Sequence, residues 1–221
     1  MSDDRVDVGK LIRDAWNRDE PAGWFEEIYA RAKNGEGRVP WAFMQPEPTL
    51  MDWINEVKLD GTDKKAIVVG CGLGDDAEAL SALGFAVTAF DISPTAIDQC
   101  KARFPQTTVD FQVADLLNLP EAWAGNFDFV LEHRTIQALP FKLCEKVIGI
   151  IAGLTAPDGQ VFVLCHGRDP DEPARGIPWA LSSKELAYFE KNGLKQTQFD
   201  EYESGVRRFR VVYRRPAINK E

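Results

Sequence analysis

The chain has 221 residues and a formal net charge of −9, which argues against nucleic acid or an anionic membrane as a partner. Its 44% hydrophobic content is ample for a packed core, no apolar run is long enough to span a bilayer, and the first residues do not read as a signal peptide. The four cysteines lack the C-x-x-C spacing of metal and redox motifs. We therefore expect a single cytoplasmic domain over 1–221, a monomer with no metal, acting on a small molecule.

Residues 1–48 are predicted to form an N-terminal arm and a helical lid, ahead of a core over 49–221. A modest helical pattern over 8–16 fits either a short helix or a disordered arm. Aromatic and aliphatic residues over 24–29 have helical spacing, and a proline-rich segment over 40–48 follows a glycine break. So many aromatic rings before the first core strand indicate a lid over a ligand. The alternative is that the rings cover one face of the sheet.

Three alternating glycines follow the first core strand, which is a short apolar run over 66–69. Gly70, Gly72 and Gly74 permit positive φ angles and let a ligand approach the backbone. The next helix begins with acidic residues in its first turn, where their negative charge interacts favourably with the positive end of the helix dipole. A strand, a glycine turn and a helix together indicate a nucleotide-binding α/β unit.

The residues after the glycines distinguish between nucleotide cofactors. A dinucleotide fingerprint, G-x-G-x-x-G/A, places a pyrophosphate on the helix N-terminus. Here Asp75 occupies the third required position, where an acid would repel a phosphate. Asp75 and Asp76 instead suit a cofactor that lacks phosphate and carries positive charge. S-adenosylmethionine, with a sulfonium and an ammonium group, is such a cofactor.

A second acidic residue supports an adenosine cofactor. The strand predicted over 85–90 ends at Asp91, which lies 91 − 70 = 21 positions after the first glycine. An acid at this distance, at the carboxyl end of a strand, is placed to accept hydrogen bonds from both ribose hydroxyls. The alternative is a helix N-cap, but Ser93 can fill that role. We therefore assign Asp91 to the ribose.

The remaining pattern predicts a Rossmann-like, doubly wound α/β fold. It has a mostly parallel seven-stranded sheet, a C-terminal antiparallel hairpin with Gly205 in its turn, and the N-terminal helical lid. The further strands are expected over 109–113, 127–131, 160–165, 195–202 and 207–214. Helices are expected over 50–57, 96–104 and 136–151, and after a capping box that begins at Ser182.

Polar residues at the strand exits are the remaining site candidates, because ligands of open α/β sheets bind at the carboxyl ends of the strands. After the third strand, Asp115 either accepts from the adenine amino group or caps a helix, while Leu116 contacts the ring. His133 and Arg134 follow the fourth strand and are the candidate catalytic groups. His166 at the exit of the fifth strand is the next candidate.

These motifs resemble the class I S-adenosylmethionine-dependent methyltransferases, and more narrowly the thiopurine, thiol and halide methyltransferase superfamily. The resemblance covers 24–215 and rests on Pro40-Trp41, on the segments 69–77, 83–88 and 91–97, and on Glu132-His133 with Ala138-Leu139-Pro140. It implies that two lid tryptophans, the turn and the strand exits contact the cofactor. The predicted cofactor contacts are Trp24, Trp41, Gly70, Gly72, Gly74, Asp91, Ile92, Asp115, Leu116 and Glu132.

The resulting functional prediction is a methyltransferase (EC 2.1.1) that uses in-line displacement, with S-methylation of a thiol or a related soft nucleophile as the first choice. A thiolate attacks more readily beside a cationic or donating group, which His133 and Arg134 would provide. Two alternatives stay open. One is a methyltransferase for an oxygen or nitrogen nucleophile, and the other is a non-catalytic module that binds S-adenosylmethionine.

Overall fold

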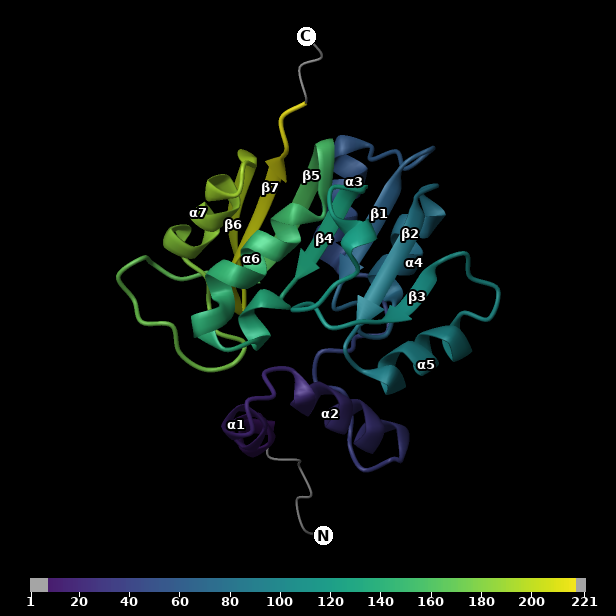
Figure 1. The fold of residues 1–221 in the computed structure, drawn as a ribbon, viewed down its shortest axis with the longest axis vertical. Helices are drawn as coiled ribbons and strands as arrows, with labels where there is room; N and C mark the ends of the chain where they lie inside the picture. The colour runs from purple at the N-terminus through teal and green to yellow at the C-terminus, as the bar shows by residue number, and fades with distance from the viewer. Residues whose placement is uncertain (1–7, 218–221) are drawn as a thin grey trace.

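The computed structural model describes residues 8–217, which form a seven-stranded sheet with helices on both faces and a helical pair at one end (Figure 1). The strand order is β3-β2-β1-β4-β5-β7-β6, and β7 runs antiparallel to both of its neighbours. The predicted doubly wound fold with its C-terminal hairpin is therefore confirmed. The strands are β1 Lys65–Val69, β2 Ala86–Asp91, β3 Asp110–Val113, β4 Phe127–His133, β5 Thr155–His166, β6 Lys195–Ser204 and β7 Val206–Arg214.

Seven α-helices and three short 3₁₀ segments precede or connect these strands within the described part of the chain. The α-helices are α1 Val8–Asn17, α2 Gly23–Lys33, α3 Pro48–Val57, α4 Asp75–Ala82, α5 Pro94–Arg103, α6 Cys144–Gly153 and α7 Ser183–Lys191; the 3₁₀ segments are η1 Glu121–Trp123, η2 Ile136–Ala138 and η3 Phe141–Leu143. The predicted capping box is present at Ser182, whose hydroxyl accepts from the N–H of Lys184. Of the two alternatives for 8–16, the structure has the helix.

The sheet has one apolar cluster on each face, as the strand period of two requires. On β1, Ile67 and Val69 belong to the cluster covered by α6 and α7, while Ala66 and Val68 belong to the cluster covered by α3, α4 and α5. Both faces of the central strands are therefore buried. This burial holds the carboxyl ends of β1, β2 and β4 rigidly at one edge.

The helix predicted over 136–151 is wrong in its first half. The structure has η2, then an extended residue at Leu139, then η3, and only afterwards α6. Pro140 causes the break, because it lacks an N–H and its ring disfavours a helical conformation at the residue before it. The carbonyl of Leu139 that this break frees accepts from the indole N–H of Trp179 at 2.8 Å.

Helices α1 and α2, in purple in Figure 1, lie across the carboxyl-end edge of the sheet. Their apolar residues form a third cluster with Leu73 and Ala96. Helix α2 is also tied to the start of α5, because the carboxylate of Glu26 accepts from the hydroxyls of Ser93 and Thr95 at 2.5 and 2.6 Å. The N-terminal helices thus close one side of the space above the strand ends.

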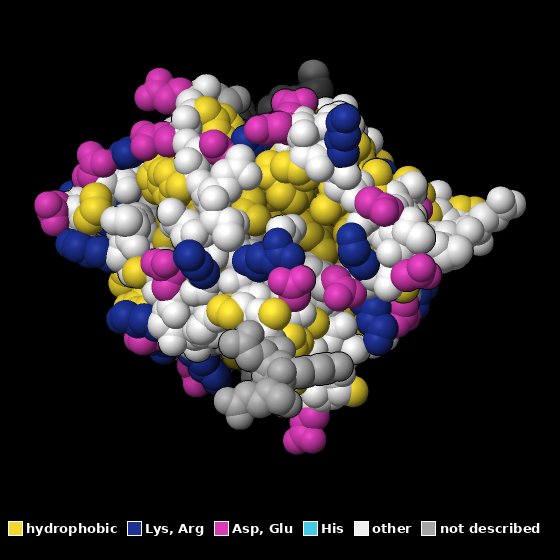
Figure 2. Space-filling view, turned by 90° about the horizontal axis from the view of Figure 1, so that it is seen from above, with side chains coloured by type: hydrophobic (Ala, Val, Ile, Leu, Met, Phe, Trp, Pro, Cys, Tyr) yellow, Lys and Arg dark blue, Asp and Glu magenta, His cyan; other side chains and the backbone are white. Residues whose placement is uncertain are grey.

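The opposite end of the molecule carries charges of both signs. Figure 2 views that end, and its basic and acidic side chains are interspersed rather than separated into patches. None of the helices in the described part of the chain is long and apolar enough to cross a membrane.

Candidate functional site

A cavity of about 720 Å³ lies between the N-terminal helices and the carboxyl ends of β1, β2, β4 and β5. Its size is in the range of sites for small molecules and cofactors. The structure brings together ten of the twelve predicted site residues in its walls: Trp24, Trp41, Gly70, Gly72, Asp91, Ile92, Asp115, Leu116, His133 and Arg134. The other two, Gly74 and Glu132, do not line the cavity.

The glycine turn after β1 has the backbone conformation that only glycine adopts without strain. Gly70 and Gly72 have φ angles of 61° and 57°. A Cβ at Gly70 would also lie 2.5 Å from the hydroxyl oxygen of Thr135, and a Cβ at Gly72 would lie 3.1 Å from that of Tyr29. The turn therefore presents bare backbone to the cavity.

Gly74 has a different role from the other two glycines. It is the N-cap of α4 with a φ of 87°, and a Cβ there would lie 2.8 Å from the ring of Phe111. Close packing of helix against strand, rather than approach of a ligand, accounts for glycine at this position.

Asp91 lies at the end of β2 with 6% of its surface exposed. One carboxylate oxygen accepts from the N–H of Gly72 at 3.0 Å and the other from the N–H of Ser93 at 2.9 Å. Burial raises the pKa of this carboxyl to about 6, although the two hydrogen bonds act in the opposite direction and lower it. Ser93, and not Asp91, caps α5, because its hydroxyl accepts from the N–H of Ala96. Each carboxylate oxygen of Asp91 keeps a further lone pair for a ligand.

The two acids at the start of α4 are both compensated by cationic or donating groups. Asp75 accepts two hydrogen bonds from the guanidinium of Arg103, at 2.7 and 2.8 Å. Asp76 accepts from the ring of His133 at 3.2 Å and from the N–H of Glu47 at 2.7 Å. Because Arg103 neutralises Asp75, repulsion of a phosphate by this acid does not by itself distinguish between cofactors. Arg103 lies on α5, 28 residues beyond Asp75, and no motif in the sequence indicates this pairing.

Asp115 and Leu116 line the cavity beyond β3. The carboxylate of Asp115 accepts from the N–H of Leu117 at 2.9 Å, so it stabilises a turn; no helix follows it in the structure. Leu116 is buried in the cluster on the α6 face. An apolar wall beside an exposed carboxylate has the character that an adenine ring requires.

Aromatic rings from α2 and the segment after it form the opposite wall. Trp24 is 4% exposed, and its indole N–H has no partner among the described residues. Trp41 packs edge-on against Trp24 and donates its indole N–H to the hydroxyl of Tyr29 at 2.9 Å. These contacts connect the N-terminal region to the glycine turn, since the same hydroxyl faces Gly72.

His133 and Arg134 belong to a polar cluster at the other end of the cavity. The Nε–H of Arg134 donates to Nε2 of His133 at 2.8 Å, while Nδ1 of the same ring contacts Asp76. The proton of this imidazole therefore resides on Nδ1, and both ring nitrogens are engaged. A second nitrogen of Arg134 donates to Glu47 at 3.2 Å. His133 therefore has no free ring nitrogen in this arrangement, while Arg134 uses Nε and one of its two terminal nitrogens.

His166 and Arg208 face the same end of the cavity from β5 and β7. They are paired in register across the two strands, so their side chains lie next to each other on one face. No described residue is hydrogen-bonded to either ring nitrogen of His166. Burial, and then the positive charges of Arg134 and Arg208, lower its pKa. His166 is therefore a neutral imidazole at pH 7.

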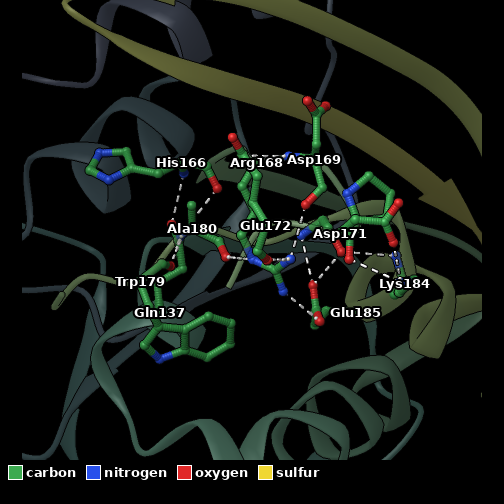
Figure 3. A network of polar contacts seen from close by, with 12 residues as sticks. Gln137, His166, Arg168, Asp169, Asp171, Glu172, Trp179, Ala180, Lys184 and Glu185 are labelled. Atoms are coloured by element: carbon green, nitrogen blue, oxygen red, sulfur yellow. Dashed lines mark hydrogen bonds and ion pairs between the residues drawn. The ribbon is translucent and has the colours of Figure 1, made fainter. Parts of the chain in front are cut away.

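The loop between β5 and α7 is held by buried polar contacts, which Figure 3 shows around Arg168 and Gln137. Gln137 accepts from the N–H of His166 and donates to its carbonyl, at 2.9 and 3.0 Å. Arg168 donates to Glu185 at 2.8 Å and to three backbone carbonyls. The imidazole of His166 projects away from this network (Figure 3). These contacts fix the backbone from which that ring enters the cavity.

Glu132 is completely buried beneath the cavity rather than in its wall. One of its carboxylate oxygens accepts from the N–H of Ile136 at 3.0 Å, and the other has no partner among the described residues. Burial raises its pKa to about 7. Its contacts brace the turn that carries His133 and Arg134.

The cavity residues fit S-adenosylmethionine on their own chemistry. The bare glycine turn, the buried carboxylate of Asp91 and the side chain of Trp24 with its unpartnered indole N–H all line the same cavity. They provide a close backbone approach, an acceptor for hydroxyl groups and an apolar surface with a free donor. Gly70, Gly72, Asp91 and the Asp115–Leu116 turn would hold the nucleoside part.

Comparison with known proteins supports the same conclusion. Residues 66–159, which carry the glycine turn and Asp91, match the family described as "Methyltransferase domain". This match confirms the predicted methyltransferase assignment for that region of the chain.

Two curated relatives are similar to part of the chain. A 2-heptyl-1-hydroxyquinolin-4(1H)-one methyltransferase from Mycobacteroides abscessus is 28% identical over 152 residues, which cover 67% of this chain and 65% of the relative. A ubiquinone biosynthesis O-methyltransferase from Dechloromonas aromatica is 32% identical over 126 residues, which cover 56% and 53%. The chain thus spans less than two thirds of the length of these relatives.

A solved structure shares the fold over most of both chains. It comes from work on the conversion of a disulfide bond into a thioacetal group during echinomycin biosynthesis. It superposes with a TM-score of 0.70 at 20% identity and covers 89% of this chain and 93% of that one.

Proposed function

Because residues 66–159 are a methyltransferase domain of the S-adenosylmethionine-dependent class, we propose that the protein transfers a methyl group from S-adenosylmethionine to an acidic hydroxyl group of a small molecule. Phenols, enols and N-hydroxy groups are hydroxyls of this kind. The observation that carries the proposal is the free, neutral imidazole of His166 beside two guanidinium groups in the cavity.

The choice of a hydroxyl follows from what each nucleophile needs. A phenol-like group has a pKa near 10 and is mostly protonated at pH 7, so its attack benefits from a general base. A thiol ionises nearer neutrality and needs mainly a nearby cation. His166 has a free ring nitrogen to accept the proton, and Arg134 and Arg208 stabilise the negative charge that develops on oxygen.

When bound, S-adenosylmethionine supplies the methyl group: the acceptor oxygen's lone pair forms the new bond to carbon as the carbon–sulfur bond breaks and sulfur leaves as a neutral thioether. His166 takes the hydroxyl proton. The aromatic wall of Trp24 and Trp41 excludes water from the reacting groups, and the rigid strand ends hold the acceptor in position. His133 acts as a positioning residue that fixes the guanidinium of Arg134.

The names of the relatives support an oxygen acceptor, since one is an O-methyltransferase and the other acts on a hydroxyquinolinone. The narrower resemblance to the thiopurine, thiol and halide branch predicts a sulfur acceptor instead, and that prediction enters the same test. We also propose that 1–221 is one methyltransferase domain with 1–48 as its lid. The cytoplasmic location and the monomeric state stay predictions.

The test is an acceptor screen with the purified protein and S-adenosylmethionine labelled in the methyl group. The panel pairs phenols and N-hydroxy heterocycles with thiols of the same ring system. We expect label in the hydroxyl compounds and much less in the thiols. Preferential labelling of thiols would overturn the oxygen acceptor and support the sulfur branch. Tight cofactor binding with no transfer to any acceptor would support the non-catalytic module.

A further inference from the structure

Arg208 is the least satisfied charged group in the cavity. The nitrogen Nε of this side chain is buried and has no hydrogen-bond partner among residues 8–217. The nearest carboxylate to this side chain in the described chain is Glu47, whose Oε1 lies 3.7 Å from Nη1 of Arg208, beyond hydrogen-bond distance. A buried guanidinium nitrogen without an acceptor is costly, so such a group calls for a ligand.

Glu47 does not form a hydrogen bond with Arg208, because it lies too far away and is turned toward other partners. One of its oxygens accepts from the N–H of Thr49 and the other from Arg134. Among the described residues, it is also the one carboxylate within 4.0 Å of either cavity guanidinium. The guanidinium groups of Arg134 and Arg208 therefore have one neighbouring carboxylate, Glu47, and it is hydrogen-bonded to Arg134 only.

The other acids in the cavity walls are engaged elsewhere. Asp75 is paired with Arg103, and Asp76 is bound by His133 and by the backbone of Glu47. Asp91 accepts from two backbone N–H groups at the cofactor end. None of these carboxylates forms an ion pair with Arg208 in the described chain, so its partly exposed guanidinium is left available to an anionic group of a bound molecule.

We propose that the methyl acceptor is a flat, largely apolar molecule that carries a carboxylate, and that Arg208 binds this carboxylate beside His166. A guanidinium presents two parallel N–H donors that match the two oxygens of a carboxylate. The adjacent walls are apolar and aromatic, with Trp41, Leu139 and the Ile177–Pro178 segment. The inference rests on the proposed function, because it defines the acceptor of that methyl transfer.

The register of the sheet explains why this arrangement is productive. His166 and Arg208 are opposite each other on β5 and β7, so a carboxylate on Arg208 places the rest of the acceptor against the imidazole. The two groups then divide the work: Arg208 binds the acceptor, and His166 receives the proton. An aromatic hydroxy acid has both functional groups on one rigid frame.

The experiment measures the binding of a matched pair of probes, 2-naphthoate and 2-naphthamide, by titration calorimetry. The protein is titrated alone and in the presence of saturating S-adenosylhomocysteine. We expect the wild type to bind the carboxylate at least tenfold more tightly than the amide. In Arg208→Gln this preference should fall to less than threefold, with the affinity for the amide unchanged. Arg208→Lys, which keeps the charge but not the paired donors, should give an intermediate preference.

Arg210→Gln is the matched control. Arg210 lies two residues further along the same strand and face, but it is paired with Asp200 and Glu56 and does not line the cavity. We expect this variant to keep the full preference for the carboxylate. The affinity of every variant for S-adenosylhomocysteine and its melting temperature verify that it is folded.

Three results would overturn the inference. They are equal affinity of the wild type for the two probes, a preference that survives in Arg208→Gln, and no binding of either probe at millimolar concentration. The wild-type comparison decides the question even if a variant does not fold. Failure of S-adenosylhomocysteine to bind would contradict the proposed function separately, because the probes are also titrated without it.

Discussion

The two ends of the cavity are built in different ways. The cofactor end comes from one short stretch of chain: the glycine turn and Asp91 lie within 22 residues (positions 70 to 91), and backbone N–H groups hold the carboxylate. The acceptor end brings together Glu47, Arg134, His166 and Arg208 from four separate segments, and its contacts are between side chains. Backbone contacts survive most substitutions, whereas side-chain contacts do not. The acceptor end is therefore the part where single substitutions have the largest effects.

The largest effect is expected for His166→Ala. Removing a general base lowers the rate by about 10²–10⁴-fold, and kcat of methyl transfer to a hydroxyl acceptor measures it. The wild-type rate should be flat above pH 6.5 and should fall below it, because the pKa of His166 lies under its ordinary value of 6.5 and the imidazole becomes protonated as the pH falls. His133→Ala should change kcat much less, since both nitrogens of that ring are engaged. An unchanged rate in His166→Ala would show that the hydroxyl ionises without a base.

The next effect is at the cofactor end. Asp91→Ala removes a charged acceptor but leaves the glycine turn in place, so we expect a loss of about 1.5–3 kcal/mol in cofactor binding, more than tenfold in Kd. Titration of S-adenosylhomocysteine measures it at pH 8. Binding to the wild type should weaken below about pH 6, where the carboxyl takes up a proton. A dissociation constant that Asp91→Ala leaves unchanged would mean that this carboxylate only braces the turn.

A smaller effect is expected beneath the site, at Glu132. Its pKa of about 7 lies above the ordinary value of 4.5, so the folded state holds a proton that the unfolded state has lost, and stability falls as pH rises from 4.5 to 7. Glu132→Gln removes this titration. We expect it to raise the free energy of unfolding by about 1–2 kcal/mol at pH 8 and to leave it nearly unchanged at pH 5.

Urea denaturation at pH 5 and pH 8 measures the free energy of unfolding of the wild type and of Glu132→Gln. Glu145→Gln, at an exposed position of α6, is the control and should be neutral at both. Equal effects of Glu132→Gln at pH 5 and pH 8 would show that the carboxyl is not titrating in this range.

The smallest effect on stability is expected for Trp41→Ala. Trp41 is only half-buried and lies over the cavity, so the melting temperature of the empty protein should change little while methyl transfer falls. Amide hydrogen exchange over 20–48 should slow when S-adenosylhomocysteine binds. A loss of about 3–5 kcal/mol, as for a core aromatic, without ligand-dependent protection would make this region a fixed wall instead of a lid.

The sequence was sufficient to predict the sheet and the hairpin, because these depend on local patterns, and most of the residues predicted to bind the cofactor line the cavity. Apolar runs predict strands, and a glycine turn followed by Asp91 at a fixed distance predicts a ribose site. The prediction of one helix over 136–151 failed at Pro140, where the extended Leu139 separates two 3₁₀ segments. A proline inside a helical pattern was the available signal.

The acceptor end was predicted only in part, since its partners are far apart in the chain. In the sequence, Arg208 lies on a strand of the predicted hairpin with alternating polar and apolar residues, and nothing there distinguishes it from an exposed arginine. Only the pairing of β7 with β5 places it beside His166. Likewise, the hydrogen bond from Arg134 to His133 depends on the backbone at Arg134, where φ is 64°. No spacing rule reports such an angle.

The loop between β5 and α7 is anchored near both of its ends. Gln137 contacts His166 and Trp179, Trp179 also donates its indole N–H to Leu139, and Arg168 contacts Glu185. Between these anchors, Ile177 and Pro178 line the cavity without pairing to any strand of the described chain. This stretch is thus an exchangeable cassette. As long as both attachments are kept, its sequence and length can change without disturbing the sheet, which makes it the natural place to graft a new acceptor specificity.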